Sequence, residues 1–217
     1  MDQEELTRLA NAIFYWLNYQ QSVCRSDILL ESSVRYPLVE YIERQLQVEV
    51  ELEKLYDDLG KRRVDFSFPH KGIDCNIELK FLSKYTSSDN QHQLIFNDLM
   101  RLSLLEGNNY FVLCGKLEHF LKRFKFAPIM AEPGNIPGTD YSNREPDTEY
   151  AEWFPFVSHQ AKLLNVSELK RLTSFETEYR VIHDQVKNIK VELVACSDNQ
   201  CPQVVYVWKV MNCTDVN

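Results

Sequence analysis

VDFSFPHKGIDCNIELKF, from Val64 to Phe81, decides the fold prediction, because it sets charges inside segments that otherwise resemble buried strands. Apolar residues alternate with other residues on both sides of the turn-forming segment Pro69–Gly72, which predicts two consecutive strands. Asp65, Glu78 and Lys80 lie within these strands. Charged side chains are costly to bury unless they form ion pairs or hold a metal. The stretch therefore predicts a sheet with charged partners inside it.

The segments that follow and precede this stretch extend it into a larger pattern. In LQVEVELEKLY, from Leu46 to Tyr56, Val and Leu alternate with Glu, which predicts a strand with one buried face. With the two strands of the opening stretch it makes a three-strand meander. A helical pattern follows at about residues 92–107, and YFVLCG, residues 110–115, predicts a strand covered on both faces.

Two helical patterns come before the meander. Apolar residues have helical spacing at about residues 3–19 and again at about residues 27–45, with Ser26 as a candidate N-cap. A turn or kink is expected near Pro37, because proline disfavours a continuous helix. The core, about residues 27–115, thus has the order helix, three strands, helix, strand around a central mixed sheet. We predict an α/β fold.

The remaining residues, about 116–217, are expected to extend the same single domain. Five prolines near residues 127–155 predict a long loop. Residues 166–185 predict a helix, and residues 189–196 and 203–210 predict a closing β-hairpin.

Charge and cysteine use limit the classes of function. The net charge is −8, whereas a freestanding nucleic-acid binder usually has a basic excess. The six cysteines include no CxxC pair, which favours a cytoplasmic location over a disulfide framework. The acidic N-terminus does not resemble a signal peptide and no stretch reaches membrane-spanning length, so we expect no membrane partner.

The three charged residues of the opening stretch are predicted to converge. Glu78 and Lys80 are two residues apart on one strand, so their side chains point to the same face. If the strands pair, Asp65 and Glu78 can meet at one metal ion beside Lys80. Two carboxylates that hold Mg²⁺ next to an ammonium suit phosphodiester hydrolysis, because the metal polarises the phosphate and acidifies a bound water. The alternative is a charge ladder on the surface of two strands.

The motifs VDF around Asp65 and IELKF around Glu78 and Lys80 are separated by twelve residues and lie in this order of elements. They resemble the PD-(D/E)xK nuclease superfamily, which has the restriction-endonuclease-like fold. Val64 stands where the family often has proline. The resemblance implies a nuclease core dependent on Mg²⁺ (or Mn²⁺), in which Asp65 and Glu78 hold the metal and Lys80 positions the attacking water. A second ELK sequence, Glu168–Lys170, follows a good N-cap and predicts a helix surface instead.

The resemblance also implies a glutamate on the helix before the meander, supporting the lysine or a second metal. Glu31 shares the apolar helical face of Val34 and Leu38, which should rest on the sheet. This choice requires a helix that continues through the two serines after Glu31. If a turn begins there, Glu40 or Glu43 could face the site instead.

Weaker signals for nucleic-acid contact lie after the third strand. Gln93, Asn97 and Arg101 recur every four residues and form a polar stripe that could border the cleft. Its alternative is a solvent face on which Asp98 pairs with Arg101. Lys84 could contact the backbone of a nucleic acid, or lie in a plain loop.

These patterns favour a metal-dependent endonuclease that acts on nucleic acid, with DNA preferred over RNA. It could serve as the cleavage subunit of a restriction, defence or mobile-element system. The acidic net charge favours DNA affinity borrowed from a homodimer mate or a partner protein. The alternative is a non-catalytic protein-interaction module that keeps the fold, in which an edge strand of the C-terminal hairpin pairs across a two-fold axis.

Overall fold

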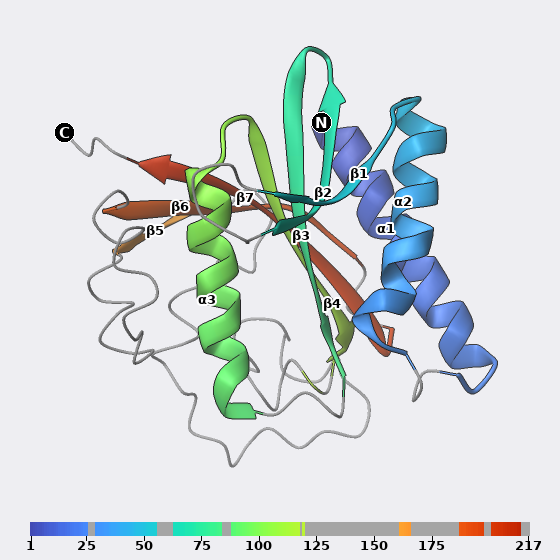
Figure 1. Ribbon diagram of the computed structural model, residues 1–217. Coiled ribbons are helices and arrows are strands. Elements are labelled where there is room, and N and C mark those ends of the chain that lie inside the picture. Colours follow the sequence, from blue (N-terminus) through green and yellow to red (C-terminus); the bar gives the residue numbers. More distant parts are fainter. Residues whose placement is uncertain are drawn as a thin grey trace.

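The computed structural model describes residues 1–25, 29–55, 63–83, 88–117, 119, 161–165, 187–197 and 201–213 (Figure 1). In these ranges the chain forms three helices and one seven-stranded sheet. The helices are α1 (Gln3–Ser22), α2 (Glu31–Leu46) and α3 (Ser88–Leu104). The strands are β1 (Glu51–Leu55), β2 (Arg63–His70), β3 (Ile73–Leu82), β4 (Asn108–Lys116), β5 (Ala161–Asn165), β6 (Asn188–Cys196) and β7 (Gln203–Cys213).

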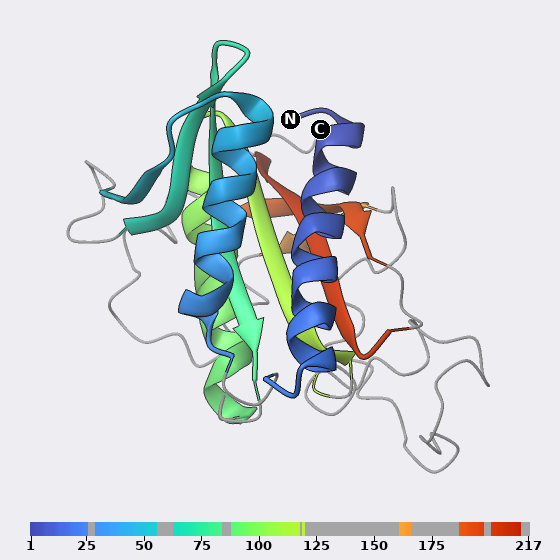
Figure 2. The ribbon, with the colours of Figure 1, turned by 90° about the vertical axis from the view of Figure 1, so that its right-hand side faces the viewer.

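The sheet is mixed, and its strands do not follow the order of the chain. They lie in the order β1-β2-β3-β4-β7-β6-β5. Strands β3 and β4 are parallel and are connected through α3, whereas the other neighbouring pairs are antiparallel. Helices α1 and α2 cover one face and α3 covers the other (Figures 1 and 2). The predicted α/β class and mixed sheet are therefore confirmed.

The two faces of β2 and β3 bury different kinds of side chain. One face joins the apolar core beneath α1 and α2, and its members on these strands are Phe66, Phe68, Cys75, Ile77, Leu79 and Phe81. Side chains alternate between faces along a strand, so the intervening residues point toward α3. The buried polar residues among them are Ser67, Asn76 and Glu78, whereas the Asp65 carboxylate pairs with Arg35 of α2. Polar groups thus lie inside the protein on the α3 side of the sheet.

Helix α1 forms as its sequence predicts. Asp2 caps it, accepting from the Glu5 N–H at 3.0 Å, while the Asp2 N–H donates to the Glu5 carboxylate at 2.7 Å. The apolar stripe is buried against the sheet, and its members are Leu6, Leu9, Ala10, Ile13, Phe14 and Leu17. Burial of this stripe holds the helix in place, because most helical stability in proteins comes from the packing of an amphipathic face.

Helix α2 differs from its prediction at two points. It begins at Glu31 rather than near residue 27, and Ser26 lies outside the described residues. It also continues through Pro37, so the turn that was one of the two expectations at this residue does not form. The proline removes one backbone donor. Burial of Val34, Leu38 and Ile42 on both sides of the proline offsets that loss.

Strand β1 is shorter and less regular than predicted. It begins at Glu51, and Leu52 is 52% exposed, although the alternation placed it on the buried face. Glu53 has φ +53, a left-handed conformation that costs a glutamate roughly 1–2 kcal/mol. The alternation therefore already fails at Leu52, next to Glu53, which lies between the paired residues Leu52 and Lys54.

The C-terminal hairpin is confirmed as β6 and β7, but it does not lie at an edge. Strand β7 pairs with both β4 and β6, and β6 also pairs with β5. The edge strands are β1 and β5, and β5 pairs with residues 188–192 of β6, so neither hairpin strand forms an edge of the sheet along its whole length. The predicted helix at residues 166–185 and the loop at residues 127–155 lie outside the described residues.

Two further observations bear on the surroundings of the protein. None of the described helices combines the length and apolar character required to cross a membrane. All six cysteines are described and all are free thiols.

Candidate functional site

The backbone pairing of β2 and β3 ends where the predicted acidic residues begin. The paired register runs from His70 opposite Ile73 to Phe66 opposite Ile77. Beyond it, side chains join the strands: the Leu79 N–H donates to the Asp65 carboxylate at 2.8 Å, and the Asp65 N–H donates to the Glu78 carboxylate at 3.4 Å. The two carboxylates therefore occupy the positions at which two strands would otherwise bond backbone to backbone.

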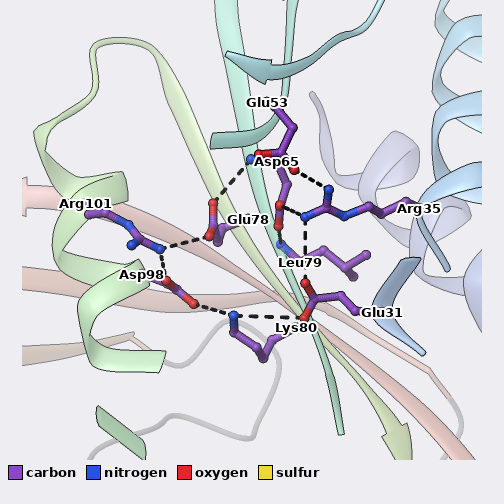
Figure 3. A network of polar contacts seen from close by, with 9 residues as sticks. All are labelled: Glu31, Arg35, Glu53, Asp65, Glu78, Leu79, Lys80, Asp98 and Arg101. Atoms are coloured by element: carbon purple, nitrogen blue, oxygen red, sulfur yellow. Dashed lines mark hydrogen bonds and ion pairs between the residues drawn. The ribbon is translucent and has the colours of Figure 1, made fainter. Parts of the chain in front are cut away.

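Charged residues from five elements gather around this point (Figure 3). We call them the charged network, and its members are Glu31, Arg35, Glu53, Asp65, Glu78, Lys80, Asp98 and Arg101. The structure thus brings Asp65, Glu78 and Lys80 together in one buried or half-buried cluster. A surface charge ladder does not describe them.

Lys80 connects the two sides of the charged network. Its Nζ lies 3.0 Å from the Asp98 carboxylate on α3 and 4.0 Å from the Glu31 carboxylate on α2 (Figure 3). Burial lowers the pKa of Lys80, but Asp98 and Glu31 outweigh it and the net pKa is raised. Lys80 is therefore a fixed ammonium group at neutral pH.

Glu31 is the helix glutamate that reaches the site. Its carboxylate lies near both Lys80 and Arg35, at 4.0 Å and 3.8 Å. Glu40 instead pairs with Arg44 at 2.8 Å on the exposed side of α2. Glu43 accepts the N–H of Val50 at 3.3 Å. The requirement that α2 continue through its two first-turn serines is met.

Helix α3 contributes a buried ion pair that points into the site. Asp98 is paired with both Lys80 and Arg101, and Arg101 also donates to Glu78 at 3.1 Å. The expected Asp98–Arg101 pair thus forms, but under the sheet rather than on a solvent face. Asn97 is buried as well, and its Oδ1 has no hydrogen-bond partner in the described part of the chain. The side chain of Gln93 and all of Lys84 lie outside the described residues.

Sequence reasoning missed three members of the charged network. Arg35 follows Glu31 by one helical turn, a spacing that could have revealed it. Asp98 shares a helical face with the buried Ile95, which could likewise have marked it. Glu53 could not have been found, because its left-handed backbone breaks the strand alternation.

Burial raises the pKa of the carboxylates nearest the strand junction. For Glu78, burial is the first cause, and the negative charges of Asp98 and Asp65 add to it, so the pKa lies well above its ordinary value. Burial also raises the pKa of Asp65, although the Leu79 N–H and Arg35 oppose it. The pKa of Glu31 is raised mainly by burial. Ionised carboxylates here need additional positive charge.

The charged network contains carboxylate oxygens, the ligand type that hard cations bind. It contains five carboxylates and three basic side chains, so its net charge is −2 when all are ionised. Magnesium takes oxygen ligands and is commonly held by one or two carboxylates with water and substrate phosphate. Asp65 and Glu78 fit that donor set. No group of three or more metal-ligating residues occurs in the described ranges, which a two-carboxylate site does not need.

Fold and charged network together define an α/β protein with a buried carboxylate and lysine centre at the end of a strand pair. Comparison with known proteins finds no matching family model and no statistically significant match among curated proteins or solved structures. The likeness to the PD-(D/E)xK superfamily therefore remains a prediction made from the motifs alone.

Proposed function

We propose that this protein hydrolyses phosphodiester bonds of nucleic acid, DNA by preference, as a Mg²⁺- or Mn²⁺-dependent endonuclease with a restriction-endonuclease-like core. One observation carries the proposal: Asp65, Glu78 and Lys80 meet where the β2–β3 backbone pairing ends. Their order along the chain and their placement on adjacent strands agree with the motif resemblance. The net negative charge of the charged network also supports the proposal, because a bound cation would balance it.

Asp65 and Glu78 would hold the cation. When bound, a divalent ion supplies charge stabilisation and acidifies a coordinated water. Its charge of +2 would balance the net charge of −2 on the charged network. It would also favour the ionised form of Glu78, whose pKa is raised by burial.

Lys80 would act as a positioned cation rather than as a general base. A base must accept a proton, whereas the raised pKa of Lys80 keeps its proton in place at neutral pH. An ammonium held between Asp98 and Glu31 can instead orient a water or stabilise negative charge that develops on phosphate. Glu31 would support this ammonium, in keeping with its predicted role.

The net charge of −8 favours a DNA-binding contribution from outside the chain. A homodimer mate or a partner protein with a basic surface would supply it, and a cleavage subunit of a restriction, defence or mobile-element system has that requirement. The six free thiols suit the cytoplasmic location predicted for such a protein.

Cleavage of supercoiled plasmid and of single-stranded DNA, with Mg²⁺ or Mn²⁺ and with EDTA, tests the proposal. We expect cleavage by the intact protein and its loss in Asp65→Asn and Lys80→Met. Glu40→Gln is the matched control, because it removes a carboxylate from α2 that pairs only away from the site. Equal cleavage by all four proteins would assign the activity to a contaminant and refute the proposal.

One observation favours a second candidate, the non-catalytic interaction module. Asp65 is already paired with Arg35, and Glu78 with Arg101, so both predicted metal ligands have cationic partners within the chain. A fold that only retains the ancestral charges could be stabilised in this way. Absence of both metal binding and cleavage, in a protein whose thermal unfolding does not respond to Mn²⁺, would favour this candidate.

A further inference from the structure

The guanidinium of Arg35 lies among three carboxylates from three elements (Figure 3). Its Nη1 pairs with Glu53 on β1, and its Nη2 pairs with Asp65 on β2 and lies 3.8 Å from Glu31 on α2. We propose that Arg35 is a resident cation that a divalent ion must displace from Asp65, and that Glu53 retains the displaced guanidinium. This inference rests on the proposed metal centre.

Asp65 cannot serve Arg35 and a divalent ion equally well. One carboxylate oxygen accepts the Leu79 N–H at 2.8 Å, and the other accepts from Arg35. A divalent ion on the second oxygen would stand close to the guanidinium, and two cations at such a distance repel each other in a half-buried site. The ion and Arg35 therefore compete for one oxygen.

Arg35 is better suited to leave than the other arginine of the charged network. Its two terminal nitrogens are divided between Glu53 and Asp65, so release of Asp65 still leaves the Glu53 pair intact. The Nη2 of Arg101 pairs with both Glu78 and Asp98. The Arg35 side chain is also the more exposed, 28% against 18% for Arg101.

The exchange explains two features that otherwise have no common cause. Asp65 is paired with Arg35, so this buried carboxylate would have a partner before an ion binds. Glu53 adopts a costly left-handed backbone on the strand next to Asp65, and its side chain meets Arg35. Both features follow if the Arg35 guanidinium pairs with Asp65 before the ion binds and is held by Glu53 alone afterwards.

Mn²⁺ binding to the full-length chain, measured by the electron paramagnetic resonance signal of the free ion, tests the exchange. We expect Arg35→Gln to bind Mn²⁺ roughly tenfold more tightly than the natural sequence, because the competing charge-assisted bond is gone. Arg44→Gln is the control: it removes the same charge from the same helix, at a side chain that is 76% exposed and pairs with Glu40. Its affinity should remain within about twofold of the natural sequence.

Arg35→Lys guards against a folding defect in Arg35→Gln. A lysine keeps the charge but lacks the planar guanidinium that bridges Glu53 and Asp65. The Mn²⁺ affinity of Arg35→Lys should therefore fall between that of the natural sequence and that of Arg35→Gln. Thermal unfolding with and without Mn²⁺ reports folding for each variant, and Asp65→Asn should abolish the Mn²⁺ response.

The outcomes separate this inference from the proposed function. Tighter binding in Arg35→Gln, or in Arg35→Lys if the glutamine variant does not fold, supports the exchange. If the natural sequence binds Mn²⁺ and the Arg35 variants bind no more tightly than Arg44→Gln, the exchange is wrong and the metal centre stands. If none of the folded proteins binds Mn²⁺, the metal centre and the exchange are both wrong.

Discussion

Asp98→Asn should destabilise the protein by about 2 kcal/mol. The Asp98 side chain is 3% exposed and is paired with Lys80 at 3.0 Å and with Arg101. Removing one partner from a buried ion pair typically costs about 3–5 kcal/mol. Here Lys80 keeps Glu31 at 4.0 Å and Arg101 keeps Glu78 at 3.1 Å, and asparagine can still accept one hydrogen bond. These contacts reduce the expected loss to about 2 kcal/mol.

Denaturant unfolding at pH 7 measures this loss as a lower midpoint, and calorimetry should show a melting temperature lower by about 4–8 °C. A double-mutant cycle with Lys80→Met should give a coupling of about 1–2 kcal/mol, since the two side chains touch. Glu40→Gln, which breaks an exposed pair with Arg44, should remain within about 0.5 kcal/mol. If Asp98→Asn is as mild as Glu40→Gln and shows no coupling, the buried ion pair does not exist in solution.

Two other perturbations test the network and the sheet that holds it. Burial and the charges of Asp98 and Asp65 raise the pKa of Glu78. With respect to this group, the protein prepared without metal should therefore be most stable below about pH 4 and should lose that stability as the pH rises through the raised pKa. Glu78→Gln should flatten the slope of unfolding free energy against pH, and an unchanged slope would contradict the assignment. Gly115 has φ +146 and an added Cβ would lie 2.5 Å from a strand carbonyl, so Gly115→Ala should cost at least about 2 kcal/mol in denaturant unfolding. Gly72→Ala, at φ +80 with nothing within 4 Å, should cost only about 1 kcal/mol, and equal costs would argue against the close contact.

The sequence was sufficient for the parts of the site that depend on local periodicity. Glu78 and Lys80 share a face because side chains on a strand alternate, and Asp65 lies on the strand that the two-residue Lys71–Gly72 turn pairs with β3. Glu31 followed from helical spacing once α2 was taken as continuous. These inferences need only neighbours in the chain.

The remaining features depend on contacts that local periodicity does not encode. Strand β5 pairs Ala161 with Glu192, so its identity depends on a partner far along the chain. Glu53 takes its position from a left-handed backbone in a residue type that rarely adopts one. The helical spacing of Arg35 and Asp98 is compatible with a place on the buried face, but a charged residue on a helix ordinarily faces water. Arg35 faces the sheet because it pairs with Asp65, and Asp98 does so because it pairs with Lys80.

The interior position of β7 has a consequence for synthesis of the chain. Residues 203–213 follow every other described strand in the sequence, yet they lie between β4 and β6. Chains fold from the N-terminus as they leave the ribosome, so Asp65, Glu78 and Lys80 can take their places on β2 and β3 while β4 still has an unpaired edge. That edge is a template for other nascent strands until β7 arrives. We therefore expect premature termination before residue 203 to yield aggregates, even though the truncated chain would still contain every member of the charged network.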